Sequence, residues 1–212
     1  MQTKKELVQE ILYELYGGIT SDEARLSERF VLTKVNNTIA FLAKKSAYET
    51  NNLEGVTCVD DSFWLSFNDL PVIIDEKTGL YCTILPAQPI GLPRQRSVQV
   101  YPLKVKGGMR SDTFKPISII EVPKITSLPP IPNKIFYYTE SGKVFFVASN
   151  LFIKNHPLVN MNIVSADGGL TAPLNLPPDM VTEAKAMVLK DLRGSMMTPA
   201  DLHNDGIEVT ER

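Results

Sequence analysis

One long amphipathic helix is predicted by residues 21–49, whose sequence is SDEARLSERFVLTKVNNTIAFLAKKSAYE. Its apolar residues recur three and four positions apart, which places them on one stripe of a helix with 3.6 residues per turn. The predicted stripe consists of Leu26, Phe30, Val31, Val35, Ile39, Leu42 and Ala43. The predicted polar side carries Lys34, Asn36, Asn37, Lys44 and Lys45. We expect the first and last helices of the chain to pack against this central helix.

The start of the central helix is predicted at one of two caps. Ser21-Asp22-Glu23 offers a serine cap followed by acidic residues, which interact favourably with the positive end of the helix dipole. Ser27-Glu28 offers a second start further along the chain. Either start makes a helical hairpin with the helix that precedes it.

That first helix is predicted from a capping box, because Glu6 follows Thr3 by three residues. Its apolar stripe is predicted to consist of Leu7, Val8, Ile11, Leu12 and Leu15, and the helix is predicted to end at Gly17-Gly18. Glu6, Glu10 and Glu14 lie four residues apart on the polar side. Because like charges at this spacing repel, we expect them to form a solvated face.

A third helix is predicted after Leu176-Pro177-Pro178-Asp179, because proline suits a first helical turn and an acidic residue suits the dipole. Its predicted apolar face consists of Met180, Val181, Ala184, Met187, Val188 and Leu192. Gly194 is predicted to end it. Residues 195–212 have too few apolar residues to fold alone, and we expect them to form an extended arm that docks on a neighbouring subunit. The candidate docking residues are Met196, Met197, Pro199, Leu202 and Asp205.

The middle of the chain is predicted to be rich in strands. All fifteen prolines lie between Pro71 and Pro199, and aromatic and β-branched residues replace the helical pattern after Glu49. Strands are predicted over residues 62–67, 72–75, 80–85, 97–103, 117–122, 135–139, 143–148 and 159–165. The clearest hairpin turns through Glu140-Ser141-Gly142, where glycine can adopt a positive φ. The proline-rich segments 86–93 and 123–132 are predicted to be loops.

These patterns predict an α+β fold. A small helical bundle would consist of an N-terminal hairpin over residues 1–55 and a C-terminal helix over residues 171–194. A large antiparallel β-rich insertion would occupy residues 56–170, and an extended arm would occupy residues 195–212. With 43% hydrophobic residues, the 212-residue chain can build a sizeable core.

Catalytic, cofactor-binding and metal-binding motifs are not predicted. His156 and His203 do not accompany a nucleophile elbow, and Cys58 and Cys82 lack a second ligand at metal-binding spacing. The two cysteines are predicted to be reduced, buried thiols. The acidic pairs Asp60-Asp61 and Asp75-Glu76 are predicted to lie in turns rather than to act as acid and base.

The net charge and the hydropathy of the chain argue against two classes of partner, nucleic acids and membranes. A formal net charge of −2 and a pI near 5.8 argue against a protein that grips nucleic acid phosphates, which needs a basic face. No long apolar run predicts a membrane span, and the N-terminus lacks the pattern of a signal peptide. We therefore expect synthesis in the cytoplasm and no membrane partner.

Two stretches of the chain carry a resemblance to a known family. The first is Leu12-Tyr13-Glu14-Leu15-Tyr16-Gly17-Gly18, followed by residues 21–29, Val35-Asn36-Asn37 and Ile39. The second is residues 176–180, followed by Thr198-Pro199-Ala200-Asp201-Leu202 and Asn204-Asp205. Together they resemble neck and ring proteins of tailed phages that infect Bacteroidetes-type bacteria, the crAss-like phages among them.

The resemblance implies a virion structural protein of the neck or tail, a head-to-tail connector or tail adaptor. Such a subunit would form a homo-oligomeric ring of twelve copies, contact the portal or neighbouring rings and tail proteins, and let double-stranded DNA pass without gripping it. No cofactor is implied. The alternative is a capsid decoration protein or a surface module whose aromatic β region binds a glycan. A virion-carried hydrolase ranks third, since acid and base groups are not evident.

Overall fold

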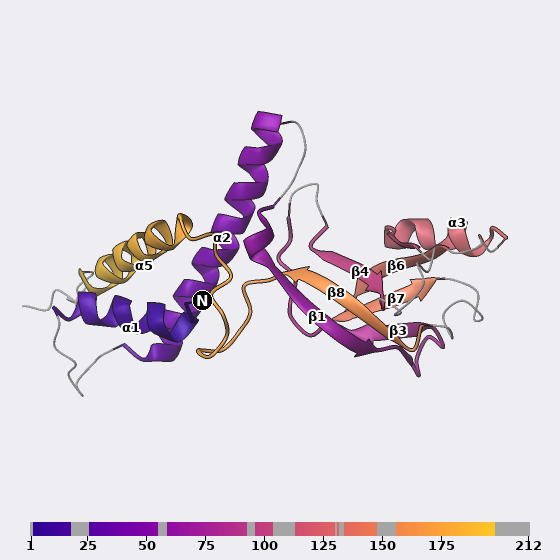
Figure 1. Cartoon of the computed structure of the whole chain (residues 1–212), viewed down its shortest axis with the longest axis horizontal. Coiled ribbons are helices and arrows are strands. Elements are labelled where there is room, and N and C mark those ends of the chain that lie inside the picture. The colour runs from indigo at the N-terminus through magenta and orange to yellow at the C-terminus, as the bar shows by residue number, and fades with distance from the viewer. Residues whose placement is uncertain are drawn as a thin grey trace, which may run out of the picture. The chain divides into compact units, whose positions relative to one another are not determined.

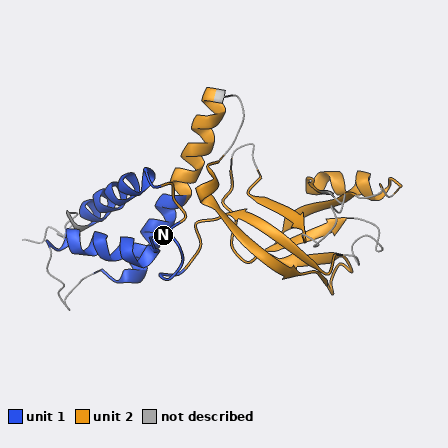
Figure 2. Cartoon of the chain, in the orientation of Figure 1, with its two compact units in different colours: residues 1–39, 169–174, 178–212 blue, residues 40–168, 175–177 orange. Residues whose placement is uncertain are grey.

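The computed structural model describes residues 2–17, 26–54, 59–92, 96–103, 113–129, 131, 134–147 and 156–197. Its elements include four α-helices and eight strands within these ranges, which confirms the predicted α+β class. The chain divides into two compact units, shown in separate colours in Figure 2. Unit 1 comprises residues 1–39, 169–174 and 178–212, and unit 2 comprises residues 40–168 and 175–177.

The first helix, α1, spans Lys4–Leu15 and has the predicted capping box. The Glu6 amide donates to the Thr3 hydroxyl at 3.3 Å, and the Thr3 amide donates to the Glu6 carboxylate at 2.9 Å. Gly17 has a φ of +65° just after the helix, a conformation that glycine adopts without steric cost. Local sequence signals therefore set both ends of α1.

The central helix, α2, spans Glu28–Glu54 and uses the second of the two predicted caps, because the Phe30 amide donates to the Ser27 hydroxyl at 3.2 Å. It ends five residues later than predicted. The predicted core positions Val31, Val35, Ile39, Leu42 and Ala43 are all buried. Two members of the predicted stripe are corrected: Leu26 precedes the helix, and Phe30 is exposed beneath the Lys34 ammonium.

The last helix, α5, spans Met180–Met197, and its residues Ala184, Val188 and Leu192 are buried. It continues through Gly194, where the sequence predicted its end. A glycine inside a helix costs only about 1 kcal/mol relative to alanine, so packing of the preceding turns can outweigh it. The predicted division of the chain at residue 195 is therefore wrong by at least three residues.

In unit 1 the N-terminal helices pack with segments from the C-terminal part of the chain. Residues 169–174 run beside the start of α1, where the Lys4 amide donates to the Ala172 carbonyl and the Leu174 amide donates to the Gln2 carbonyl. The ammonium of Lys185 on α5 lies 2.9 Å from the Glu14 carboxylate on α1 and 3.8 Å from that of Glu10. The predicted solvated face of α1 is thus partly an ion-pair contact with α5.

Unit 2 contains two sheets (Figure 1). The three-stranded sheet has the antiparallel order β1-β8-β4, with β1 spanning Trp64–Pro71, β8 spanning Leu158–Val164 and β4 spanning Val98–Pro102. The five-stranded sheet has the order β2-β3-β7-β6-β5. Its strands span Ile73–Ile74, Tyr81–Ile84, Lys143–Val147, Lys134–Glu140 and Thr113–Pro116 in that order.

The two sheets pack face to face. Their shared core contains Val98 and Val100 of β4, Val159, Met161 and Ile163 of β8, Ile135 and Tyr137 of β6, and Val144 and Phe146 of β7. These residues alternate with residues of the opposite face along each strand, as a pleated strand requires. The aromatic content of the predicted hairpin is therefore largely used for packing.

The predicted hairpin is confirmed as β6 and β7, which pair from Phe136–Val147 to Glu140–Lys143. Ser141 and Gly142 form a two-residue connection with φ values of 48° and 75°. Positive φ at both positions is the geometry of a type I′ turn, whose twist matches that of the flanking strands.

The segment around residues 113–132 differs from the prediction. The strand predicted over residues 117–122 is instead the 3-10 helix η2, Ile119–Glu121, which leads into the helix α3, Val122–Thr126. The loop predicted over residues 123–132 contains most of α3. Strand β5, absent from the prediction, pairs in parallel with β6, so the predicted antiparallel insertion holds one parallel pair.

A capping box that the sequence interpretation missed explains the helical turn. The Ser118 amide donates to the Glu121 carboxylate at 2.7 Å, and the Ser118 hydroxyl caps η2. Pro123 follows at the start of α3, where its missing amide hydrogen costs nothing. The spacing Ser118-x-x-Glu121-x-Pro123 was thus the available signal for a helix at this position.

Candidate functional site

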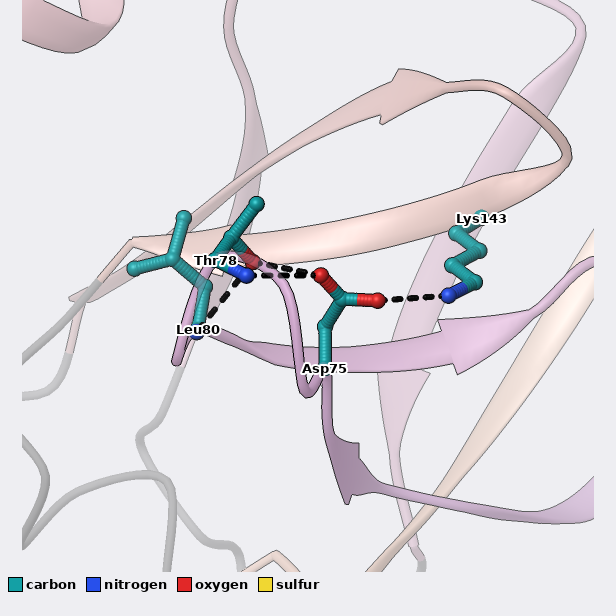
Figure 3. A network of polar contacts seen from close by, with 4 residues as sticks. All are labelled: Asp75, Thr78, Leu80 and Lys143. Carbon is teal, nitrogen blue, oxygen red and sulfur yellow. Dashed lines mark hydrogen bonds and ion pairs between the residues drawn. The ribbon is translucent and has the colours of Figure 1, made fainter.

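A connected polar network of unit 2 lies at Asp75, in the turn between β2 and β3 (Figure 3). One carboxylate oxygen of Asp75 accepts hydrogen bonds from the Thr78 amide at 3.0 Å and the Thr78 hydroxyl at 2.8 Å. The other lies 2.5 Å from the Lys143 ammonium at the start of β7. Asp75 therefore joins the β2–β3 turn to the next strand of the sheet.

The contacts of Asp75 stabilise the fold rather than prepare the carboxylate for proton transfer. The Lys143 ammonium and the Thr78 hydrogen bonds lower the pKa of Asp75 from 3.8 to about 2, and Asp75 in turn raises the pKa of Lys143. A carboxylate that stays ionised and already accepts three hydrogen bonds is a poor proton carrier near neutral pH. The prediction that Asp75 belongs to a hairpin turn is confirmed.

We expect Asp75→Asn to flatten the acid limb of the stability curve. Because the folded chain depresses the pKa of Asp75 to about 2, the stabilisation is fully present above about pH 4. It is lost as pH falls from about 4 toward 2, where the folded carboxylate takes up its proton. Urea unfolding at several pH values between 2 and 7 measures this change.

The matched control for that experiment is Glu76→Gln, which removes an exposed carboxylate from the same turn. We expect Glu76→Gln to keep the steep acid limb of the parent. An acid limb of equal steepness in Asp75→Asn and the parent would show that the ion pair does not contribute to folding.

The other carboxylates and nucleophiles singled out in the sequence also have structural places. The Asp60 carboxylate accepts from the Ser62 amide at 2.8 Å and caps the 3-10 helix η1, Asp61–Phe63, which confirms a turn before Trp64. Cys82 is a buried, free thiol whose pKa is raised by burial. Cys58 and His203 lie outside the described residues.

His156, to which the sequence assigned no role, is buried, with 3% of its surface exposed. Its ring meets the Phe114 ring edge-on, with 5.4 Å between the centroids. Phe114 also meets Phe146 edge-on in the core of the sandwich. Removing the imidazole would therefore open a cavity between aromatic rings, so this histidine matters for packing although the sequence assigned it no role.

Two hollows flank the loop that follows β3. One, of about 370 Å³, is lined by residues that include Ile90, Arg96, Ser118 and Tyr138. The other, of about 450 Å³, is lined by residues that include Leu85, Gln88 and Glu140. Both are open, and Pro89 and Thr139 line both of them.

Tyr137 lies in the wall of the first hollow, but its hydroxyl is occupied. It donates to the Val98 carbonyl at 3.2 Å and accepts from the Val100 amide at 3.4 Å, which joins β6 to β4 across the sandwich. Burial raises the pKa of Tyr137 to about 12. This hydroxyl therefore holds the two sheets together rather than facing a ligand.

The predicted docking residues fall at or beyond the end of the described chain. Met196 and Met197 belong to the last turn of α5 rather than to an extended arm. Pro199, Leu202 and Asp205 lie outside the described residues, so their docking role stays a prediction.

An apolar surface that the sequence interpretation missed lies on η2 and α3. Val122 and Ile125 pack inward against a cluster on the outer face of the five-stranded sheet, which includes Ile117, Tyr138 and Phe145. The outward side chains form what we call the α3 surface, which consists of Ile119, Ile120, Lys124, Leu128 and Ile131. Ile120 is 81% exposed, and Leu128 is 56% exposed.

In the described part of the chain, no three His, Cys, Asp or Glu side chains cluster as metal ligands. Its helices include none with the length and apolar character needed to cross a bilayer.

The fold and its surfaces define an α+β protein with a helical unit made from both chain ends and a β-sandwich unit that carries the exposed apolar α3 surface. No family model and no curated protein matches this chain.

Proposed function

We propose that this chain is a ring-forming virion subunit, a head-to-tail connector or tail adaptor that joins a phage portal to the tail and lets the genome pass. The observation that carries this proposal is that α1 and α5, the two helices at which the resembling stretches lie, contact each other in unit 1. Residues 12–18 begin in α1, and residues 176–180 lead into α5. The Lys185 ammonium joins these helices by contacting Glu14 and Glu10.

The contact between α1 and α5 matters because the two stretches are more than 130 residues apart in sequence. A chance likeness of two short segments would not require them to belong to one packed unit. A helical unit made from both chain ends also leaves all eight named strands within one stretch of chain, residues 40–168, which can carry surfaces for neighbouring subunits.

Electrostatics supports passage of DNA rather than its capture. The chain carries 22 basic and 24 acidic residues, and its net charge of −2 provides little attraction for phosphates. By the resemblance the ring contains twelve subunits, and its partners are the portal, neighbouring ring proteins and tail proteins. The proposed location is the neck or tail of the virion.

We expect the purified chain to be monomeric alone and to form rings when it is coexpressed with the portal protein of the same phage. Negative-stain electron microscopy and mass photometry of the purified complex measure this outcome. The matched control is coexpression with the portal of an unrelated phage, which should yield no rings. A chain that stays monomeric with its own portal would contradict the proposal.

A decoration or glycan-binding module is the second candidate, and the two open hollows beside Pro89 are the observation that favours it. The reasoning from aromatic residues has lost support, because Tyr137, Tyr138, Phe145 and Phe146 are all buried. Such a module should remain a monomer or trimer and cosediment with capsids or a surface polymer. A connector should instead form rings with its portal and should not cosediment with either.

A further inference from the structure

We propose that the α3 surface binds the acidic C-terminal segment, residues 198–212, of a second copy of this chain. The inference rests on the proposed ring-forming function and names the contact between neighbouring subunits. Ile119, Ile120 and Leu128 are large aliphatic side chains exposed on a short helical segment whose other side is already packed. Clustered exposed apolar groups of this kind mark interaction sites in folded proteins.

Lysines lie beside these aliphatic groups. Lys124 is exposed on α3 itself. Lys115 of β5 pairs with Phe136, which packs on the outer face of the sheet, so Lys115 points to the same face as α3. Lys134 lies two residues before Phe136 on β6 and therefore shares that face. Two exposed carboxylates, Glu121 of η2 and Glu140 of β6, lie on the same face, so the three lysines leave a small basic excess there. An apolar surface with this excess favours an acidic partner that also carries aliphatic residues.

The C-terminal segment has this composition. Residues 198–212 have the sequence TPADLHNDGIEVTER, in which four carboxylates oppose one arginine for a formal charge of −3. Its aliphatic residues are Leu202, Ile207 and Val209, interspersed among Asp201, Asp205, Glu208 and Glu211. Fifteen residues can extend over roughly 50 Å.

The exposed sheet edges suit such a contact less well. Strands β1, β4 and β5 each pair on one side only, and each ends in a proline: Pro71, Pro102 and Pro116. The remaining edge strand, β2, has no proline but is only two residues long. Because proline has no amide hydrogen, it weakens the addition of another strand at an edge. The α3 surface is therefore the better acceptor for a neighbouring chain.

The presence of both contact surfaces on the same chain also fits a closed ring. A head-to-tail contact requires two different complementary surfaces on every subunit, and it closes into a ring when the rotation between subunits allows it. The α3 surface would serve as acceptor, and residues 198–212 would serve as donor. Aliphatic contacts supply most of the binding free energy between the two surfaces. Because the lysines add an electrostatic attraction, the affinity should fall as the salt concentration rises.

The test is a complementation experiment between two variants. Ile120→Glu keeps the donor segment and spoils the acceptor, whereas a chain that ends at Met197 keeps the acceptor and lacks the donor. We expect the mixture, at concentrations well above those at which the purified parent chain is monomeric, to form a one-to-one complex by analytical ultracentrifugation, while each variant alone associates at least tenfold more weakly. Tyr48→Glu, at another exposed apolar site of unit 2, is the matched control and should behave like the parent chain.

A labelled peptide of residues 198–212 gives the second readout. Its fluorescence anisotropy should report saturable binding to the truncated chain, with at least tenfold weaker binding after Ile120→Glu and weaker binding at 500 mM than at 50 mM salt. Binding that Ile120→Glu leaves unchanged would overturn the inference. Peptide binding without complex formation in the mixture would mean that the segment does not reach a neighbouring chain, which also overturns the inference. A parent chain that stays monomeric at the concentration at which the mixture associates would mean that each chain binds its own segment, and this too overturns it.

The outcomes separate this inference from the proposed function. If each variant by itself still forms rings with the portal, the contact is refuted and the connector function remains supported. A one-to-one complex from a chain that never forms rings with its portal would support the contact and refute the connector function.

Discussion

Ile39→Asp should prevent unit 1 from folding. Ile39 lies in the middle of the buried side of α2, with no exposed surface, so the substitution places a carboxylate in an apolar environment. Burying an unpaired charge belongs to the short list of changes that cost more than about 4 kcal/mol, a large part of a typical folding free energy. Circular dichroism and thermal unfolding of the purified chain measure the loss.

Asn37→Asp is the matched control, because it places the same carboxylate at an exposed position of the same helix. We expect its unfolding free energy to stay within about 0.5 kcal/mol of the parent value. An Ile39→Asp chain that melts like the parent would mean that the buried side of α2 has been assigned incorrectly.

Asn36→Leu should destabilise the chain through a buried lysine on another helix. The side chain of Lys4 is fully buried, and its ammonium donates to the Asn36 side-chain oxygen at 2.8 Å. Removing this acceptor leaves a buried charge with one partner fewer, which costs about 2–3 kcal/mol. Urea unfolding measures the difference in the free energy of unfolding.

A double-mutant cycle separates this effect from simple packing. Lys4→Met removes the charge and keeps much of the volume, so it should change stability far less than Asn36→Leu, and the double variant should recover most of the loss. Lys5→Met, at the exposed neighbouring lysine, is the control and should be nearly neutral. Strict additivity of the two single variants would show that the Lys4–Asn36 contact contributes nothing.

These two predictions differ in how far the sequence supports them. The burial of Ile39 follows from periodicity alone, because Val31, Val35 and Ile39 recur every four residues. The burial of Lys4 does not, since a lysine at the start of a helix ordinarily faces water. Its burial depends on Asn36, which lies 32 residues away and was assigned to the polar side of α2.

The candidate interaction surface was equally hard to predict. The four β-branched apolar residues of segment 117–122 suggested a strand, whereas the Ser118–Glu121 capping box produces a short helix that exposes Ile119 and Ile120. A short segment of this composition fits either structure, and only the cap distinguishes them. The Asp75 turn was predictable, but its ion pair with Lys143 joins residues 68 positions apart.

The sequence by itself determined the helices α1, α2 and α5, the β6–β7 hairpin and the α+β class, because caps, periodicity and turn residues act over a few neighbouring positions. Only the tertiary structure decided the parallel pairing of β5 with β6, the continuation of α5 through Gly194 and the packing of α3 on the outer sheet face. Each of these depends on partners distant in sequence, whose burial and hydrogen bonds outweigh local preference by a few kcal/mol.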